Sequence, residues 1–185
     1  IVNAGYPGEQ GGTAVADVLF GDYNPAGRLP LTYYKSLDEL PAFDDYDITK
    51  GRTYKYFKGD VLYPFGYGLS YSSFKYSDLK VKDGANTVSV SFRLKNTGKR
   101  KGDEVAQVYV RIPETGGVVP IKELKGFRRI PLKSGESRVV EIELDKEQLR
   151  YWDAGLGQFI VPQGAFDIMV GASSKDIRLQ TVINL

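Results

Sequence analysis

Acid–base chemistry in this chain is limited to Asp, Glu, Lys and Tyr side chains. The sequence contains no His and no Cys, which excludes disulfides, thiol catalysis, zinc fingers and Ser-His or Cys-His nucleophile pairs. The densest acidic group is Asp44, Asp45 and Asp47, around Tyr46. Paired carboxylates about 5–10 Å apart hydrolyse glycosidic bonds, and carboxylates also bind Ca²⁺. The cluster lacks the spacing and the glycine of an EF-hand loop, so we favour a solvated loop.

A glycine-rich loop, residues 6–12, leads into a predicted helix. Backbone N–H groups at a helix start attract anions, and glycine permits close approach of a ligand. The loop has neither the lysine of a P-loop nor the GxGxxG spacing of a dinucleotide site. Glu9 would complement the helix dipole. We therefore interpret the loop as structural capping, with a ligand-facing role as the alternative.

Aromatic side chains are most dense in residues 51–57 and 62–71, and 11 of the 13 Tyr lie within residues 1–76. Such rings can stack on sugars, and each also buries about 150–250 Å² when it joins two parts of a protein. Nucleic-acid stacking would need basic surroundings, but residues 1–70 are net acidic. The predicted role is packing between the two halves of the chain, through Tyr54, Tyr56, Phe57, Tyr63 and Phe65.

Basic residues gather in two turns, Lys99–Lys101 and Arg128–Arg129, which we interpret as solvated sheet edges that discourage edge pairing. The formal net charge of +2 argues against a nucleic-acid partner. No apolar run approaches the ~20 residues of a membrane span. The chain opens at Ile1 within an apolar run that lacks Met, so we expect a part of a larger protein.

Strand periodicity dominates residues 71–185. Apolar and polar side chains alternate in five runs separated by glycine-containing turns, a pattern typical of a two-sheet antiparallel sandwich of the immunoglobulin or fibronectin type. Trp152, the only tryptophan, is predicted to be a core or sheet-edge anchor. The runs are Val88–Leu94, Ala106–Ile112, Val140–Leu144, Phe166–Val170 and Ile177–Ile183.

The first part of the chain has a different pattern. Residues 11–21 predict a short helix that ends at Gly21, with strand-like residues 1–4 before it and residues 29–33 after it. A single strand-helix-strand unit cannot bury both faces of a sheet, so it must pack on the sandwich or on further protein. We expect the apolar helix face to be exposed in this chain, at Val15, Val18 and Leu19.

Several strings resemble one enzyme family. Residues 5–8, 11–22 and 24–30 are similar to the late segment of the second catalytic domain of glycoside hydrolase family 3. Residues 63–71, followed by Phe74 and Tyr76, resemble the junction into its C-terminal fibronectin type III-like domain, whose signatures resemble residues 102–109 and 123–127. These matches cover nearly the whole chain in the family's order.

The resemblance implies a mainly β fold with two parts. Residues 1–70 would be the C-terminal remnant of the α/β sandwich catalytic domain, its last strand-helix-strand part, plus an aromatic linker. Residues 71–185 would form the fibronectin type III-like domain, an immunoglobulin-like β-sandwich.

The activity that the resemblance implies is a retaining exo-glycosidase that releases β-linked sugars from non-reducing ends of oligosaccharides. The family's nucleophile Asp lies in an N-terminal barrel domain, and its acid/base Glu usually lies earlier in the second domain. No residue of this chain matches either motif, and the order Gly8-Glu9-Gln10 departs from the more common Gly-Gln-Glu. We assign no catalytic residue, no metal and no cofactor, leave the substrate-binding residues unknown, and predict that this chain alone is inactive.

Residues 4–34 and 51–57 look more like β-xylosidase-type members than like β-glucosidases. We favour xylose, and keep β-glucosidase and α-L-arabinofuranosidase specificity open. The expected partner is the remaining N-terminal catalytic portion and, through it, an oligosaccharide, in the periplasm or outside the cell; neither nucleic acid nor a membrane is expected. The alternatives are a stand-alone carbohydrate-binding module and a protein-binding adhesion sandwich.

Overall fold

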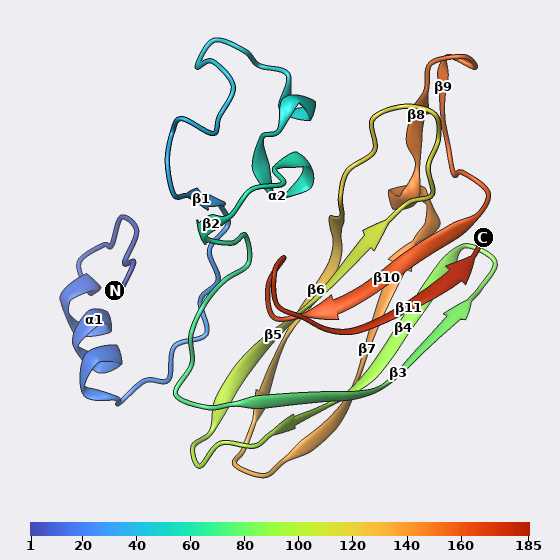
Figure 1. The fold of residues 1–185 in the computed structure, drawn as a ribbon. Coiled ribbons are helices and arrows are strands. Elements are labelled where there is room, and N and C mark those ends of the chain that lie inside the picture. Colours follow the sequence, from blue (N-terminus) through green and yellow to red (C-terminus); the bar gives the residue numbers. More distant parts are fainter.

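The computed structural model describes residues 1–185 as a β-sandwich with an N-terminal arm, residues 1–73, along one side (Figure 1). One sheet has the strand order β11-β10-β5-β6 and the other has the order β3-β4-β7, and every neighbouring pair is antiparallel. The predicted mainly β fold with a two-sheet antiparallel sandwich is confirmed. The strands are β3 (Phe74–Asp83), β4 (Thr87–Asn96), β5 (Gly102–Arg111), β6 (Glu123–Leu132), β7 (Ser137–Asp145), β10 (Ala165–Gly171) and β11 (Ile177–Asn184).

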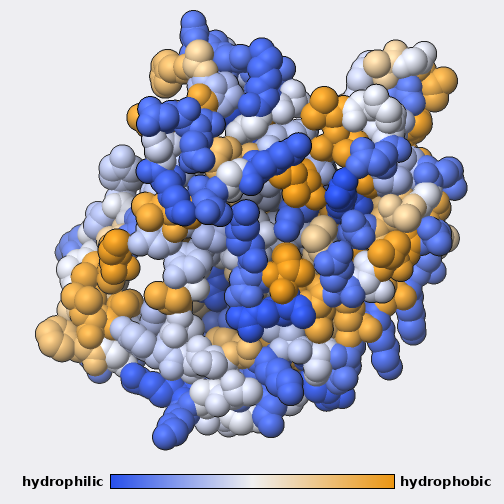
Figure 2. Space-filling model, viewed as in Figure 1, coloured by the Kyte–Doolittle hydropathy of each residue, from blue (hydrophilic) through white to orange (hydrophobic).

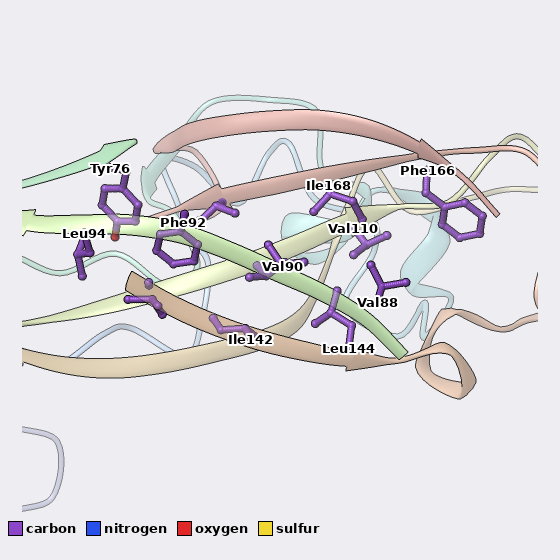
Figure 3. Packing of buried hydrophobic residues seen from close by; sticks show 14 of the residues in the cluster. Tyr76, Val88, Val90, Phe92, Leu94, Val110, Ile142, Leu144, Phe166 and Ile168 are labelled. Carbon is purple, nitrogen blue, oxygen red and sulfur yellow. The ribbon is translucent and has the colours of Figure 1, made fainter. Parts of the chain in front are cut away.

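The core lies between the two sheets and contains a cluster of 18 buried residues (Figure 3). The predicted alternation places every second side chain of β4 in this core, with the polar side chains between them facing outward. Each fully buried large aliphatic or aromatic side chain contributes about 1.5–3 kcal/mol through loss of its water contact. The alternating runs on β7 and β10 also point inward, whereas those of edge strand β11 are only half-buried.

Strand β5 departs from simple alternation because both of its faces are covered. Ala106, Val108 and Val110 point into the core as predicted, but Gln107 and Tyr109 on the opposite face are also buried. The arm lies over that opposite face, where the Gln107 side chain donates to the carbonyl oxygen of Gly66.

The arm contains little regular structure. Helix α1 ends as predicted, since Gly21 takes the left-handed conformation (φ 85°) and donates its backbone N–H to the carbonyl of Val18. A short antiparallel pair of strands and two single-turn helices follow. The elements of the arm are α1 (Gly11–Phe20), β1 (Tyr33–Tyr34), η1 (Ile48–Lys50), α2 (Thr53–Tyr56) and β2 (Val61–Tyr63).

Two expectations for the arm are wrong. Residues 1–4 form no strand, because no neighbouring strand is present to pair with their N–H and C=O groups. Of residues 29–33, only Tyr33 enters a strand, where it pairs with β2. The loop before α1 places Glu9 one residue ahead of the N-cap Gln10, and no side chain makes a capping hydrogen bond there.

A two-stranded hairpin, β8 (Tyr151–Asp153) and β9 (Gln158–Ile160), extends beyond the sheets at one end of the sandwich (Figure 1). Of the two positions predicted for Trp152, core or sheet edge, the structure excludes the core, because the residue is 54% exposed in the two-stranded β8–β9 sheet and packs edge-to-face on Phe159 at 5.2 Å. The core in this region ends instead at Leu149 of η2 (Lys146–Leu149).

No helix in this structure has both the length and the apolar character that crossing a membrane requires.

Candidate functional site

The structure concentrates its buried polar groups at the junction between the arm and the sandwich. Asn24 is the first anchor: its side chain accepts hydrogen bonds from the Tyr71 backbone (2.8 Å) and the Ser70 hydroxyl (2.9 Å) and donates to the Lys101 carbonyl (2.9 Å). One amide side chain thereby ties three segments together. An amide offers donors and an acceptor in one plane, which this role requires.

Arg28, Glu104 and Tyr76 form the buried centre of the junction. Arg28 Nη2 lies 3.3 Å from Glu104 Oε1, and the side chains of this ion pair are 9% and 5% exposed. The Tyr76 hydroxyl donates to the same carboxylate oxygen at 3.0 Å. Burial first, and then the charge of Glu104, raise the pKa of Tyr76 far above its ordinary value, so its hydroxyl stays protonated as a donor.

The backbone approaches very closely beside this ion pair. Leu29 N donates to Tyr67 O and Gly66 N donates to Leu29 O, each at 2.8 Å. A Cβ atom added at Gly68 would overlap the carbonyl oxygen of Gly27, so this crossing requires glycine. A cavity of about 410 Å³ adjoins the crossing, between the arm and the turn that joins β10 to β11.

Aromatic rings of the arm contact the sandwich at fewer points than the sequence predicted. Tyr54 stacks on Phe65 at 4.3 Å, meets the Tyr109 ring edge-on at 5.9 Å, and its hydroxyl accepts a hydrogen bond from the Leu124 backbone. Phe57 and Tyr63 instead pair with Tyr34 and Tyr33 within the arm.

Glu123, on β6, forms an ion pair with the arm. Lys55 of the arm lies 2.5 Å from one oxygen of Glu123, and Lys125 lies 2.9 Å from the other. Burial alone would raise the pKa of Glu123, but the hydrogen bonds from the two lysines outweigh it and lower the pKa below its ordinary value.

The acidic cluster of the sequence lies in an exposed loop, as expected. Asp45 pairs with Lys50 at 2.8 Å, and Asp47 accepts a hydrogen bond from Thr49 N and caps η1. Hydrogen bonds with these partners lower the pKa of both carboxyls. The two carboxylates therefore have local structural partners and do not face each other across a cleft. No group of three or more His, Cys, Asp or Glu side chains is arranged to hold a metal ion.

The prediction of a turn at Arg128–Arg129 is wrong, because both residues lie within edge strand β6, where they pair with β5. The two basic segments are also not simply solvated. The Arg100 guanidinium donates to the Gly21 carbonyl at the end of α1 and lies 5.7 Å from the centre of the Tyr71 ring. Arg129, on edge strand β6, pairs with Asp103 at 2.7 Å and donates to the Tyr23 hydroxyl. Both arginines thus fix the segment after α1 to the sandwich, a role that their sequence positions did not indicate.

Helix α1 presents an apolar surface to solvent. Leu19 is 62% exposed and Phe20 is 85% exposed, and no residue of the helix is buried. Figure 2 shows apolar atoms gathered over this side of the molecule. The expected exposure is confirmed at Leu19, whereas Val15 and Val18 are half-buried.

Sequence comparison finds two domain models in succession. Residues 1–71 match the glycosyl hydrolase family 3 C-terminal domain, and residues 104–174 match the fibronectin type III-like domain. The xylan 1,4-beta-xylosidase of Xylanibacter ruminicola is 46% identical over 98% of this chain, and the periplasmic beta-glucosidase of Salmonella typhimurium is 37% identical over 96%. These alignments cover 21% and 25% of the two relatives, so the chain spans about a quarter of their length.

Solved structures show the same arrangement of arm and sandwich. Beta-glucosidase 3B from Thermotoga neapolitana, solved with glucose, superposes with a TM-score of 0.88 at 36% identity, over 95% of this chain and 27% of that one. The Beta-D-glucoside glucohydrolase from Trichoderma reesei superposes with a TM-score of 0.87 at 33% identity, over 95% of this chain and 29% of that one.

Proposed function

Because this chain belongs to glycoside hydrolase family 3, we propose that it forms the C-terminal part of a retaining, exo-acting glycosidase. The observation that carries this proposal is the match of residues 1–71 to the family 3 C-terminal domain, followed by a fibronectin type III-like domain over residues 104–174, with a xylan 1,4-beta-xylosidase 46% identical over 98% of the chain. In such an enzyme, one carboxylate attacks the anomeric carbon while a carboxylic acid protonates the leaving oxygen.

Within that enzyme, residues 1–70 would complete the α/β sandwich catalytic domain and lead through the aromatic linker to a fibronectin type III-like domain, residues 71–185. The exposed Leu19 and Phe20 support this division, because further α/β structure would cover them. The sandwich would brace the catalytic domains through the buried pair of Arg28 and Glu104.

The catalytic carboxylates would come from the N-terminal portion of the enzyme. The buried Glu104 and the half-buried Glu123 at the junction support this assignment, since Glu104 is paired with Arg28 and Glu123 is paired with two lysines. The partners of this chain would therefore be that N-terminal portion and, through the assembled enzyme, an oligosaccharide.

For the sugar we propose xylose, with glucose as the alternative. The xylan 1,4-beta-xylosidase is 46% identical to this chain, against 36–38% for the next three relatives, which are named as β-glucosidases. We also propose a periplasmic or extracellular location, which the periplasmic relative supports.

Hydrolysis of p-nitrophenyl β-xyloside and β-glucoside tests the proposal. The 185-residue chain should release no nitrophenol, whereas the encoded enzyme that includes the N-terminal portion should hydrolyse the xyloside with the higher kcat/KM. Turnover by the short chain would show that the catalytic groups lie within it. Failure of the longer enzyme on both glycosides would refute the glycosidase assignment.

A further inference from the structure

A second cavity, of about 320 Å³, lies where the arm meets two loops of the sandwich. The loop between β5 and β6 contributes Ile121 and Lys122, and the turn between β10 and β11 contributes Ser174 and Lys175. The arm closes the cavity with residues that include Thr32 and Lys58. Three lysines therefore line one cavity, and no acidic residue lines it.

None of these three lysines forms an ion pair. An acidic residue lies close to each of them in sequence, but all three acids are paired elsewhere. Asp60 pairs with Lys35, Glu123 pairs with Lys55 and Lys125, and Asp176 pairs with Arg178. The cavity lining thus contains three lysines without an ion-pair partner, of which Lys58 and Lys175 are exposed and Lys122 is half-buried. An anion in the cavity would reduce the repulsion between their charges.

Lys122 is the most constrained of the three. Its ammonium group donates to the Ser174 carbonyl at 3.0 Å and is half-buried. Burial first, and then the neighbouring charge of Lys175, lower the pKa of Lys122. A bound anion would offset both effects. Thr32 of the arm also lines this cavity.

The walls of the cavity are fixed before any ligand arrives. Ile121 N donates to the Lys55 carbonyl at 2.7 Å, and Ser174 N donates to the Phe65 carbonyl at 3.0 Å. Both sandwich loops are thereby tied to the arm. Apolar walls that include Phe57 reduce the local dielectric constant, which strengthens a charge-assisted hydrogen bond to an anion.

We propose that this cavity binds an oxyanion, with Lys58, Lys122 and Lys175 as cationic donors. Charge complementarity selects the ligand class, since three lysines without ion-pair partners line a cavity of about 320 Å³, which is large enough for a phosphate or carboxylate group. The oxyanion has two sources: a phosphate-bearing small molecule, or a carboxylate of a small molecule or of the remaining enzyme.

The proposal is tested by titrating the 185-residue chain with inorganic phosphate and, separately, with acetate, at constant ionic strength set with NaCl. Constant ionic strength removes the general screening effect of added salt. Amide chemical shifts from ¹H–¹⁵N spectra report the binding position, and the shifts should be largest at Thr32, Ile121–Lys122 and Ser174–Lys175. Saturation by phosphate alone identifies a phosphate site, and comparable saturation by acetate identifies a carboxylate site.

Matched variants decide whether the lysines carry the binding. Lys122→Met should raise the dissociation constant about 5- to 20-fold, because one charge-assisted hydrogen bond to the anion is lost. Lys175→Met changes an exposed side chain, should fold normally, and should also weaken binding. Lys82→Met removes an exposed positive charge on β3 and should leave binding unchanged. Equal effects of all three substitutions, or shifts that are spread over Lys99–Lys101 and Arg128–Arg129 instead, would overturn the proposal.

Discussion

Replacing Arg28 by Met should be one of the most destabilising single changes in this protein. The substitution leaves Glu104 as a charged group that is 5% exposed, with only the Tyr76 hydroxyl as a hydrogen-bond donor. Removing one partner of a buried ion pair costs about 3–5 kcal/mol, because the other charge remains without compensation. For a protein of this size each kcal/mol lowers Tm by roughly 2–4 °C, so the expected fall is roughly 6–20 °C.

The assay is urea and thermal unfolding followed by far-UV circular dichroism, with two controls. Arg93→Met breaks an ion pair of similar geometry, with 2.8 Å between Nε and the Asp78 oxygen, but both side chains are at least half exposed. This control should cost less than about 1 kcal/mol. The double variant Arg28→Met/Glu104→Gln removes the uncompensated charge and should recover part of the loss. A cost for Arg28→Met within 1 kcal/mol of the Arg93→Met control would refute the reasoning.

Three further outcomes can be measured on the same chain. Gly68→Ala should lower the free energy of unfolding by more than about 2 kcal/mol, because the added methyl group overlaps a carbonyl oxygen. Gly12→Ala, whose methyl group meets open space in α1, should raise the free energy of unfolding by about 0.5–1 kcal/mol. The urea midpoints of the two variants test this difference. Leu19→Ser should leave the stability of this chain within about 0.5 kcal/mol, because the side chain is largely exposed, and should reduce self-association in sedimentation velocity; a large fall in Tm would mean that α1 is packed in solution. Because the folded pKa of Glu123 is lowered, its ionised form adds stability above the unfolded pKa of about 4.3, and that stability is lost as the pH falls through the folded value. Glu123→Gln should therefore flatten the stability-against-pH curve below about pH 5, and an unchanged curve would exclude this linkage.

The residues of the junction were visible in the sequence, but their roles were not. Asn24 and Arg28 lie in a segment that resembles the family motif, yet nothing local shows that they bond to residues more than 40 positions away. Arg100 lies in a basic turn typical of solvated edges, and only the fold places the end of α1 against it. The lysines of the second cavity lie in three distant segments, so no spacing rule would have grouped them.

Local patterns in the sequence were sufficient to predict the sandwich, since an alternation such as that of Val88, Val90 and Phe92 depends only on which side of a strand each residue faces. Helix α1 and its end at Gly21 were predictable for the same local reason. Tertiary structure decided which surfaces are covered. It buried the second face of β5 under the arm, left Trp152 exposed on a hairpin, and left residues 1–4 unpaired. Burial depends on segments far apart in the chain, and the periodicity of one segment contains no information about what packs against it.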